Sequence, residues 1–520
     1  MKKKILSFLL SITIIISLLL PFNAYSLSNL ETTTGNVPGV DFTTSLAQYS
    51  EFSRKITDGA FYIPGLVNTV SYDKEYKCYA SVPTMVPQAM CTVDQFTLIT
   101  AYDSDENARS VIYVLDNNKN LVKTLILPDS YHVGGITYDL ANRVILIAKA
   151  TRSAVGVISV DSFYRYLSFN SPFIRVSYSV SESVSDVKIS SASGVTYRNG
   201  RIYLTSFNSS GSSSAYCYIP TYDSANKTYS LKYQYKFYLP AYTQGITISN
   251  YKEKTRLFVS VSYGRSESKS IYCSYLYTYT FDEQTGNKTF DNILACPPML
   301  QQTYCLGGKL YCLFESAADI YRSVNKNPVD VVVPLKLSQL CDEKRGSSVN
   351  ISVSDVNDGK NIKIATNISG AKIYYSSGMP YIGGKSVKNA YSYKSSYTKT
   401  ASGMVYAVAV LDGRIVASDA VYVTVGKASA PSKPKITAKS SKAVNLKWNK
   451  ASNASGYYIY RSTSKNGKYT KIATVSSSKN TFKDKSVKSN KTYYYKVKAY
   501  RKGYKNSDFS TYVSVKTKKS

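Results

Sequence analysis

The chain has 520 residues, too many for one hydrophobic core, and this length predicts two to four domains. It carries 65 Lys and Arg against 33 Asp and Glu, a formal net charge of +32, and one histidine, His132. A single histidine excludes metal centres built from several histidines. A Ser-His-Asp triad would have to use His132, and the sequence offers no Gly-x-Ser-x-Gly elbow to support it.

The first 26 residues have the pattern of a secretory signal peptide. Residues 2–4 are lysines, residues 5–20 are apolar, and Ala24-Tyr25-Ser26 provides a cleavage site. The apolar run is short and Pro21 follows it directly, which favours export over an uncleaved membrane anchor. We therefore expect an extracellular protein without a membrane span, either free or held non-covalently at the cell wall.

Residues 27–40 are expected to form a flexible leader, and residues 41–345 a β-rich domain. This domain contains a recurring sequence pattern, which we call the phrase. Each copy has a small or polar residue, a glycine position, a short apolar run, a turn and a second apolar run, most plainly in residues 193–206. The residues just before the glycine position are Gln88, Gly134, Ser193, Gln244 and Gln301. The copies stand roughly 45 to 60 residues apart, a period that predicts the blades of a β-propeller.

Five copies predict five blades, and a sixth sheet would form if residues 41–80 paired with the strand expected over residues 329–337. Two separate β-sandwiches are the alternative for this region, and the regular spacing favours the propeller. Residues 86–116, 132–135 and 308–323 resemble secreted propeller-like proteins of Gram-positive bacteria. The resemblance implies a propeller fold and an extracellular setting, and it does not imply a particular activity.

All eight cysteines lie before residue 342, and an even number in an exported chain permits disulfides. A Gly-Gly turn at residues 307–308 predicts a hairpin in which Cys305 faces Leu310 and Cys312 faces Thr303. The two sulfurs are then diagonal neighbours, about 7–8 Å apart, which is too far for a bridge. Most of the cysteines are expected to be buried thiols.

Two small β-sandwiches are expected after the propeller. Residues 346–426 resemble the small sandwich appended to chitobiase-type enzymes, which implies a spacer. Residues 427–520 resemble a fibronectin type III module, with Trp448 as its core tryptophan. This last module holds 24 Lys or Arg against Asp484 and Asp508, a net charge of 24 − 2 = +22, so the chain is a weakly basic body with a strongly basic end.

Seven residues are candidate ligand contacts, because they stand before the phrase glycine or follow strands that propellers place near the axis. They are Gln88, His132, Gln244, Arg265, Gln301, Glu315 and Arg322. For His132 the alternative is a packing role, and for the charged residues it is simple solvation. Asp103, Asp105 and Asn107 begin like a calcium loop, but the pattern breaks at Ala108, so no metal and no cofactor are expected.

The amides before the phrase glycine suit hydrogen bonding to neutral ligands better than proton transfer. We therefore expect a monomeric, non-catalytic, surface-associated protein whose propeller binds a glycan or peptide. Its basic module would retain it on anionic wall polymers, and the alternative for this module is that its lysines only keep an exposed spacer soluble. Export makes nucleic acid an unsuitable partner. The alternative function is an extracellular polysaccharide hydrolase or lyase, which would use paired carboxylates at the propeller axis.

Overall fold

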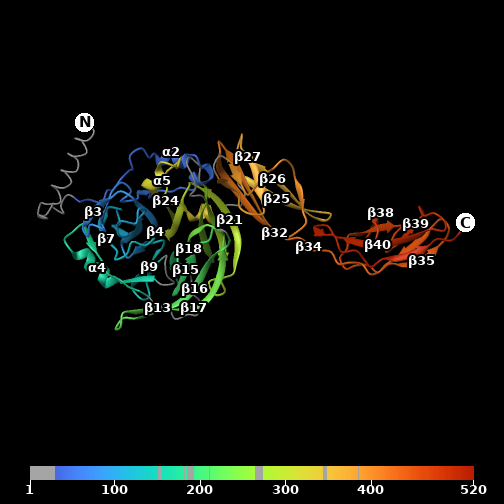
Figure 1. Ribbon diagram of the computed structural model, residues 1–520, viewed down its shortest axis with the longest axis horizontal. Coiled ribbons are helices and arrows are strands. Elements are labelled where there is room, and N and C mark those ends of the chain that lie inside the picture. Colours follow the sequence, from blue (N-terminus) through green and yellow to red (C-terminus); the bar gives the residue numbers. More distant parts are fainter. Residues whose placement is uncertain are drawn as a thin grey trace, which may run out of the picture.

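The computed structural model describes residues 30–149, 155–180, 182–183, 192–209, 211–263, 273–342, 348–383 and 386–520. The protein is all-β with a few short helices, as the sequence predicts. The signal-peptide segment and Arg265 lie outside the described residues. Figure 1 shows three parts along the chain: a group of sheets, a smaller module against it, and a last module that projects away from both.

Five sheets of four or five strands, built mainly from antiparallel pairs, occupy the first part, as far as the described residues define them. Their innermost strands are β4 (Met85–Val93), β8 (Ile136–Asp139), β14 (Gly194–Arg198), β18 (Thr243–Tyr251) and β22 (Leu300–Leu306). Each innermost strand contacts the next one along the chain, and β22 contacts β4. The five innermost strands therefore form a ring, and each recurring phrase of the sequence covers one of them and the strand that follows it.

Antiparallel strand pairs lead outward from each innermost strand. The second strands are β5 (Phe96–Asp103), β9 (Val144–Ala148), β15 (Arg201–Ser206), β19 (Lys254–Tyr263) and β23 (Lys309–Phe314). The third strands are β6 (Val111–Leu115), β10 (Val155–Ser159), β16 (Ser213–Asp223), β20 (Cys273–Phe281) and β24 (Val331–Lys336). The fourth strands are β7 (Leu121–Ile126), β12 (Ser179–Val180), β17 (Thr228–Leu239), β21 (Lys288–Cys296) and β1 (Phe61–Tyr62), with β11 (Phe173–Arg175) beyond β7 and β13 (Glu182–Ser183) beyond β17.

The expected pairing between the N-terminal region and residues 329–337 is present. Phe61 pairs with Val332 and Tyr62 with Val331, so β1 joins the free edge of β24. This contact completes the fifth sheet and does not add a sixth, because β24 already pairs with β23. The next strands, β2 (Thr69–Tyr72) and β3 (Tyr79–Val82), form a separate hairpin that packs on Phe173 through Tyr79.

The leader expected to be flexible is packed from residue 30 onward. Val37 is fully buried, and its backbone N–H donates to Asp330 Oδ2 at 2.9 Å. The backbone N–H of Thr33 donates to Asn68 O at 2.9 Å. The expectation was wrong for these residues because their backbone groups find partners far away in the sequence, which local composition does not reveal.

The hairpin around residues 307–308 has the predicted register. Cys305 faces Leu310, and Cys312 faces Thr303. Gly307 and Gly308 have φ angles of 57° and 75°, the left-handed conformation that a tight two-residue turn requires. The cysteines whose side chains are described, namely Cys78, Cys91, Cys217, Cys296, Cys305, Cys312 and Cys341, are all free thiols.

Glycines allow the innermost strands to approach each other backbone to backbone. A Cβ atom on Gly134 would lie 2.1 Å from Ser193 O, and one on Gly135 would lie 2.3 Å from Val195 N. Both distances are far below van der Waals contact, so these positions of the phrase have to lack a side chain.

Gly135→Ala is expected to lower the free energy of unfolding by about 1–3 kcal/mol, because the added methyl group meets backbone atoms that cannot rotate away. Gly245→Ala is the control, since its Cβ would meet a side-chain atom, Gln302 Cγ, at 3.0 Å and no backbone atom closer than 3.5 Å. Denaturant unfolding measures both. Equal stabilities of the two variants would contradict the close approach of β8 and β14.

The middle module is a sandwich of two sheets, as far as the described residues extend. One sheet contains β25 (Val349–Val356), β26 (Gly359–Thr366) and β31 (Tyr397–Lys399); the other contains β30 (Tyr391–Ser392), β27 (Lys372–Ser376), β32 (Gly403–Leu411) and β33 (Arg414–Val423). A further hairpin consists of β28 (Tyr381–Gly383) and β29 (Ser386–Lys388).

This module shares a hydrophobic core with the fourth sheet of the ring. Val408 and Ile415 belong to the same buried cluster as Tyr275 and Tyr277. The hydroxyl of Tyr275 donates to Pro380 O at 2.7 Å. A spacer that merely separates its neighbours would not bury such a surface, so the module is a docked part of the first domain.

The last module is a second sandwich, with sheets of three and four strands among the described residues. The sheets are β35 (Lys435–Lys439), β36 (Val444–Lys447) and β39 (Thr481–Asp484), and β38 (Thr470–Ser476), β37 (Gly456–Ser462), β40 (Thr492–Tyr500) and β42 (Val513–Lys516). Trp448 is 1% exposed and packs edge-on against Tyr457 between the sheets, the structural role predicted for it.

In the part of the chain that is described, no helix is long and apolar enough to cross a membrane.

The junction between the two sandwiches is hydrogen-bonded. β34 (Gly426–Lys427) pairs in parallel with β41 (Tyr504–Lys505). The backbone N–H of Gly503 donates to Val356 O at 2.9 Å, and that of Asn506 donates to Asp358 Oδ1 at 2.8 Å. These bonds define the direction in which the last module projects (Figure 1).

Candidate functional site

Three of the predicted ligand residues lie at β-bulges of innermost strands. Gln88 is the additional residue of β4, Gln244 is that of β18, and Gln301 stands in the bulge of β22. A bulge interrupts the ladder and changes the direction of a side chain, and bulges are frequent next to functional sites. The sequence phrase thus marks a repeated backbone irregularity, which hydrophobic periodicity alone does not predict.

Gln88 and Glu315, 227 residues apart, meet in the interior. Gln88 Nε2 donates to Glu315 Oε2 at 3.1 Å and to Pro87 O at 3.0 Å, and both side chains are 1% exposed. Glu315 is the first residue after β23, and its backbone N–H donates to Met299 O. We call the three bulge residues Gln88, Gln244 and Gln301, together with Glu315, the axial cluster; the contact established within it is the hydrogen bond between Gln88 and Glu315.

Two buried atoms of the axial cluster have no hydrogen-bond partner in the described part of the protein. They are the acceptor Gln88 Oε1 and the donor Gln301 Nε2. The Ser260 hydroxyl reaches the backbone here, with Gln301 O at 2.5 Å and Gly245 O at 3.1 Å. A buried polar atom without a partner costs about 1–3 kcal/mol. Both atoms are enclosed by the protein, so they are unsatisfied hydrogen-bonding groups inside the ring and not part of an open ligand surface.

The remaining predicted residues lie elsewhere or have other partners. The His132 ring packs on Tyr102 with 4.4 Å between ring centroids, as its alternative packing role requires. Arg322 ends the short helix α5 (Asp319–Arg322) and pairs with Asp319 at 2.5 Å. The structure therefore joins Gln88 and Glu315 directly, while it gives Arg322 an ion pair within its own helix.

Threonines of the phrase, which the sequence analysis did not single out, connect the innermost strands. Thr196 Oγ1 donates to Ile246 O at 2.8 Å, and the hydroxyls of Thr247 and Thr303 lie 2.8 Å apart. Thr137 Oγ1 accepts the backbone N–H of Tyr197 at 3.0 Å. Thr137, Thr196 and Thr247 each follow the phrase glycine by two residues, and this recurrence was the signal that could have revealed them. They line a cavity of about 150 Å³ between the innermost strands.

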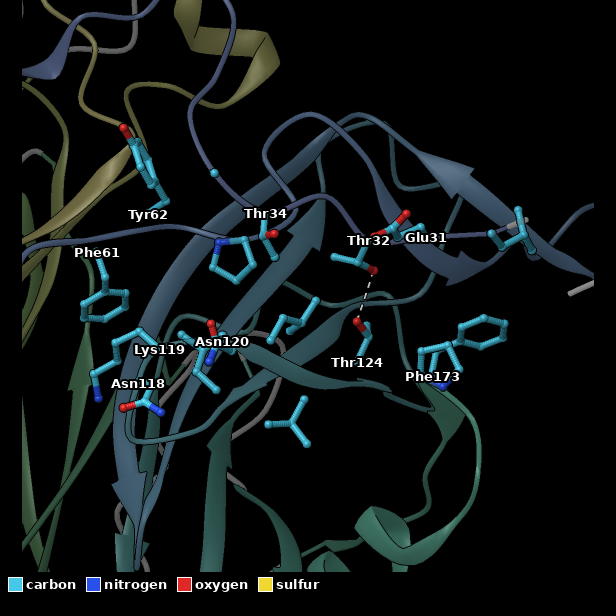
Figure 2. Close-up of a pocket in the computed structure, with 17 residues that line it drawn as sticks. Glu31, Thr32, Thr34, Phe61, Tyr62, Asn118, Lys119, Asn120, Thr124 and Phe173 are labelled. Carbon is cyan, nitrogen blue, oxygen red and sulfur yellow. Dashed lines mark hydrogen bonds between the residues drawn. The ribbon is translucent and has the colours of Figure 1, made fainter. Parts of the chain in front are cut away.

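A larger cavity of about 510 Å³ lies at the outer edge of the first sheet, beside the N-terminal segment. Figure 2 shows Phe61 close to Lys119 and Asn118 at one end and Phe173 at the other. The hydroxyls of Thr32 and Thr124 lie 3.1 Å apart on its wall. No sequence pattern predicted this cavity, because one wall comes from residues 30–35 and the other from residues 115–124.

The two acidic residues of the basic module are both engaged. Asp484, 2% exposed, accepts hydrogen bonds from Arg461 at 2.9 Å and from the Tyr495 hydroxyl at 2.8 Å. Burial by itself would raise the pKa of Asp484, but the hydrogen bonds from Ser486, Tyr495 and Arg461 outweigh it and lower the pKa below the usual range. Asp508 pairs with Lys427 at 2.6 Å. The lysines of the module are therefore left almost without acidic neighbours.

Comparison with known proteins finds similarity for parts of the chain. No family model matches the sequence, and no curated protein is similar to it. A fibronectin type III-like protein from Clostridium thermocellum is 30% identical over 18% of this chain and 96% of its own, with a TM-score of 0.16. A two-domain fibronectin type III segment of chicken tenascin is 14% identical over 34% of this chain and 100% of its own, also with a TM-score of 0.16.

Proposed function

We propose that the protein is an exported, non-catalytic binding protein of the cell surface. Its first domain is a five-bladed β-propeller that presents a binding face, and its last module is of the fibronectin type III class. That module retains the protein on an anionic polymer of the cell wall. The ring of innermost strands and the pairing of β1 with β24 support the propeller, because a propeller repeats four-stranded sheets around an axis and β1 supplies the fourth strand of the last sheet.

The observation that carries the retention role is the separation of charge along the chain. The last module has a net charge of +22, from 24 basic and two acidic residues, while the remaining 41 basic and 31 acidic residues give +10. Charges of one sign on a small sandwich attract polyanions over a distance that salt shortens, from about 10 Å at 0.1 M to about 3 Å at 1 M. The module also projects away from the other parts, so its surface is accessible (Figure 1).

The axial cluster supports the binding role of the propeller. Its acceptor and donor without partners, Gln88 Oε1 and Gln301 Nε2, are neutral amide atoms, which suit a glycan or a peptide backbone better than a charged ligand. Both atoms are enclosed in the described structure, so binding there requires the ring to open around them. Glycoside hydrolysis needs a second carboxylate opposite the first at about 5–10 Å. In the axial cluster Glu315 stands with three glutamines, and the Gln88 amide donates to it. Binding is therefore the function that this cluster favours.

Retention is tested by washing isolated cell walls that carry the bound protein with increasing salt. The full chain is expected to stay bound at about 0.1 M salt and to elute before about 1 M, because screening removes the attraction. A chain that ends at residue 426 is expected to elute in the first wash, at the lowest salt concentration. If both chains elute at the same salt concentration, the retention role is wrong.

A further inference from the structure

One face of the last module combines lysines with aromatic rings. Along β40 the side chains alternate, so Tyr495, Val497 and Ala499 are fully buried while Lys496 and Lys498 point outward. Across the sheet, Tyr460 faces Lys496 and Tyr458 faces Lys498. The lysine–aromatic face consists of Lys471, Lys496, Lys498, Tyr458, Tyr469 and Phe509.

Each lysine of this face is held over a ring. The ammonium of Lys496 lies 4.2 Å from the ring centre of Tyr469, and that of Lys498 lies 4.3 Å from Phe509. Lys471 lies 4.7 Å from the ring centre of Tyr458 on the neighbouring strand. Contacts of this kind contribute about 0.5–1 kcal/mol at exposed sites. They also restrict flexible side chains that would otherwise lose about 2 kcal/mol of rotamer entropy on binding.

The same contacts determine what the face can recognise. An ammonium over a ring occupies the surface on which a base or a sugar would stack. Recognition is therefore left to the charges, of which Lys496 and Lys498 stand two residues apart on β40, a backbone spacing of about 6.6–6.8 Å. An extended phosphodiester chain presents its charges at comparable intervals, so two successive phosphates can meet these two lysines.

The kind of cation on the module is compatible with phosphate. Of the 24 basic residues of the module, only Arg461 and Arg501 are arginines. Arg461 is bound to Asp484, and Arg501 lies 3.9 Å above the ring of Tyr504. The accessible cations are thus lysines, which bind phosphate as point charges, whereas arginine offers paired hydrogen bonds to carboxylate and phosphate alike.

The opposite sheet carries lysines in a different arrangement. Lys435 and Lys447 face each other directly across β35 and β36, and Lys483 stands exposed on β39. Like charges placed opposite each other destabilise a sheet. The cation–π contacts described above order the lysines of the lysine–aromatic face and not these lysines. This sheet therefore has similar charge without the ordered row.

We infer that the lysine–aromatic face is the site where the module binds its polyanion, and that this polyanion is a polyol-phosphate or sugar-phosphate chain without bases. The inference rests on the proposed retention function and adds the face and the chemical class.

The test uses the full chain, with synthetic poly(glycerol phosphate) and single-stranded DNA of equal charge as probes, at about 0.1 M salt. Lys496→Glu with Lys498→Glu is compared with the charge-matched pair Lys447→Glu and Lys483→Glu, and thermal unfolding confirms that both variants fold. The first pair is expected to weaken binding of poly(glycerol phosphate) about tenfold or more, and the second about two- to threefold. Phe509→Ala, which changes no charge, is expected to weaken it about two- to fivefold through the freed Lys498.

The outcomes separate the two proposals. Equal losses from both lysine pairs would overturn the face and leave retention intact. Tighter binding of DNA than of poly(glycerol phosphate) would overturn the chemical class. If the unaltered chain binds neither probe at about 0.1 M salt, the retention function itself is wrong.

Discussion

Replacing Asp484 with alanine is expected to lower the free energy of unfolding of the last module by about 3 kcal/mol. The carboxylate is buried and accepts hydrogen bonds from Arg461, Ser486 and the hydroxyl of Tyr495. Its removal leaves that tyrosine hydroxyl, which is fully buried, without an acceptor. Denaturant unfolding of the full chain, followed by the fluorescence of Trp448, reports on this module because Trp448 is the only tryptophan.

The same carboxylate predicts a dependence of stability on pH. Because the pKa of Asp484 is lower in the folded than in the unfolded module, its contribution is present above the unfolded value of about 3.9 and is lost as the pH falls through the folded pKa. The Asp484→Asn variant is expected to lack this part of the acid-induced loss. Asp508→Ala is the control, since Asp508 is exposed and is expected to leave the stability unchanged. Equal losses in the two alanine variants would contradict a structural role for Asp484.

Removal of the middle module is expected to destabilise the first domain. A chain that ends at residue 345 exposes the apolar surface around Tyr275 and Tyr277, which Val408 and Ile415 cover in the intact protein. We expect this chain to unfold at a lower temperature than a chain that ends at residue 426 and to aggregate, because large exposed apolar patches associate.

A single substitution in this interface gives the magnitude. Ile415→Ala removes a side chain that is 1% exposed and is expected to cost about 2–5 kcal/mol. Val353→Ala is the matched control in the same module, because Val353 is 39% exposed. Calorimetry of both chain lengths and both variants measures these effects. If the chains ending at 345 and 426 have the same first unfolding transition, the two parts do not stabilise each other.

The docked middle module and the hydrogen-bonded junction suggest how binding and retention are arranged. The first two parts share a core, while the last module joins through the β34–β41 pair and the bonds from Gly503 and Asn506. A polymer held on the lysine–aromatic face would therefore lie at a distance from the axial cluster, and both sites could be occupied together.

Local patterns were sufficient for the elements of the fold. Alternation of apolar and polar residues predicted the strands, and the Gly-Gly turn at residues 307–308 predicted the pairing of Cys305 with Leu310. The role of Trp448 and the charge of the last module also followed from the sequence alone. These features depend on neighbouring residues or on composition, so they can be predicted from a single sequence without an alignment.

The position of Glu315 beside Gln88, the packing of residues 30–40 and the docking of the middle module required the tertiary structure. Each depends on contacts between residues that are far apart in the chain, and no local pattern encodes which distant partner satisfies a buried polar group or an apolar face. The same reason explains the number of sheets, since the pairing of β1 with the open edge of β24 joins the two ends of the first domain. The sequence by itself determined the strands and the charge, and the long-range contacts decided which residues form a site.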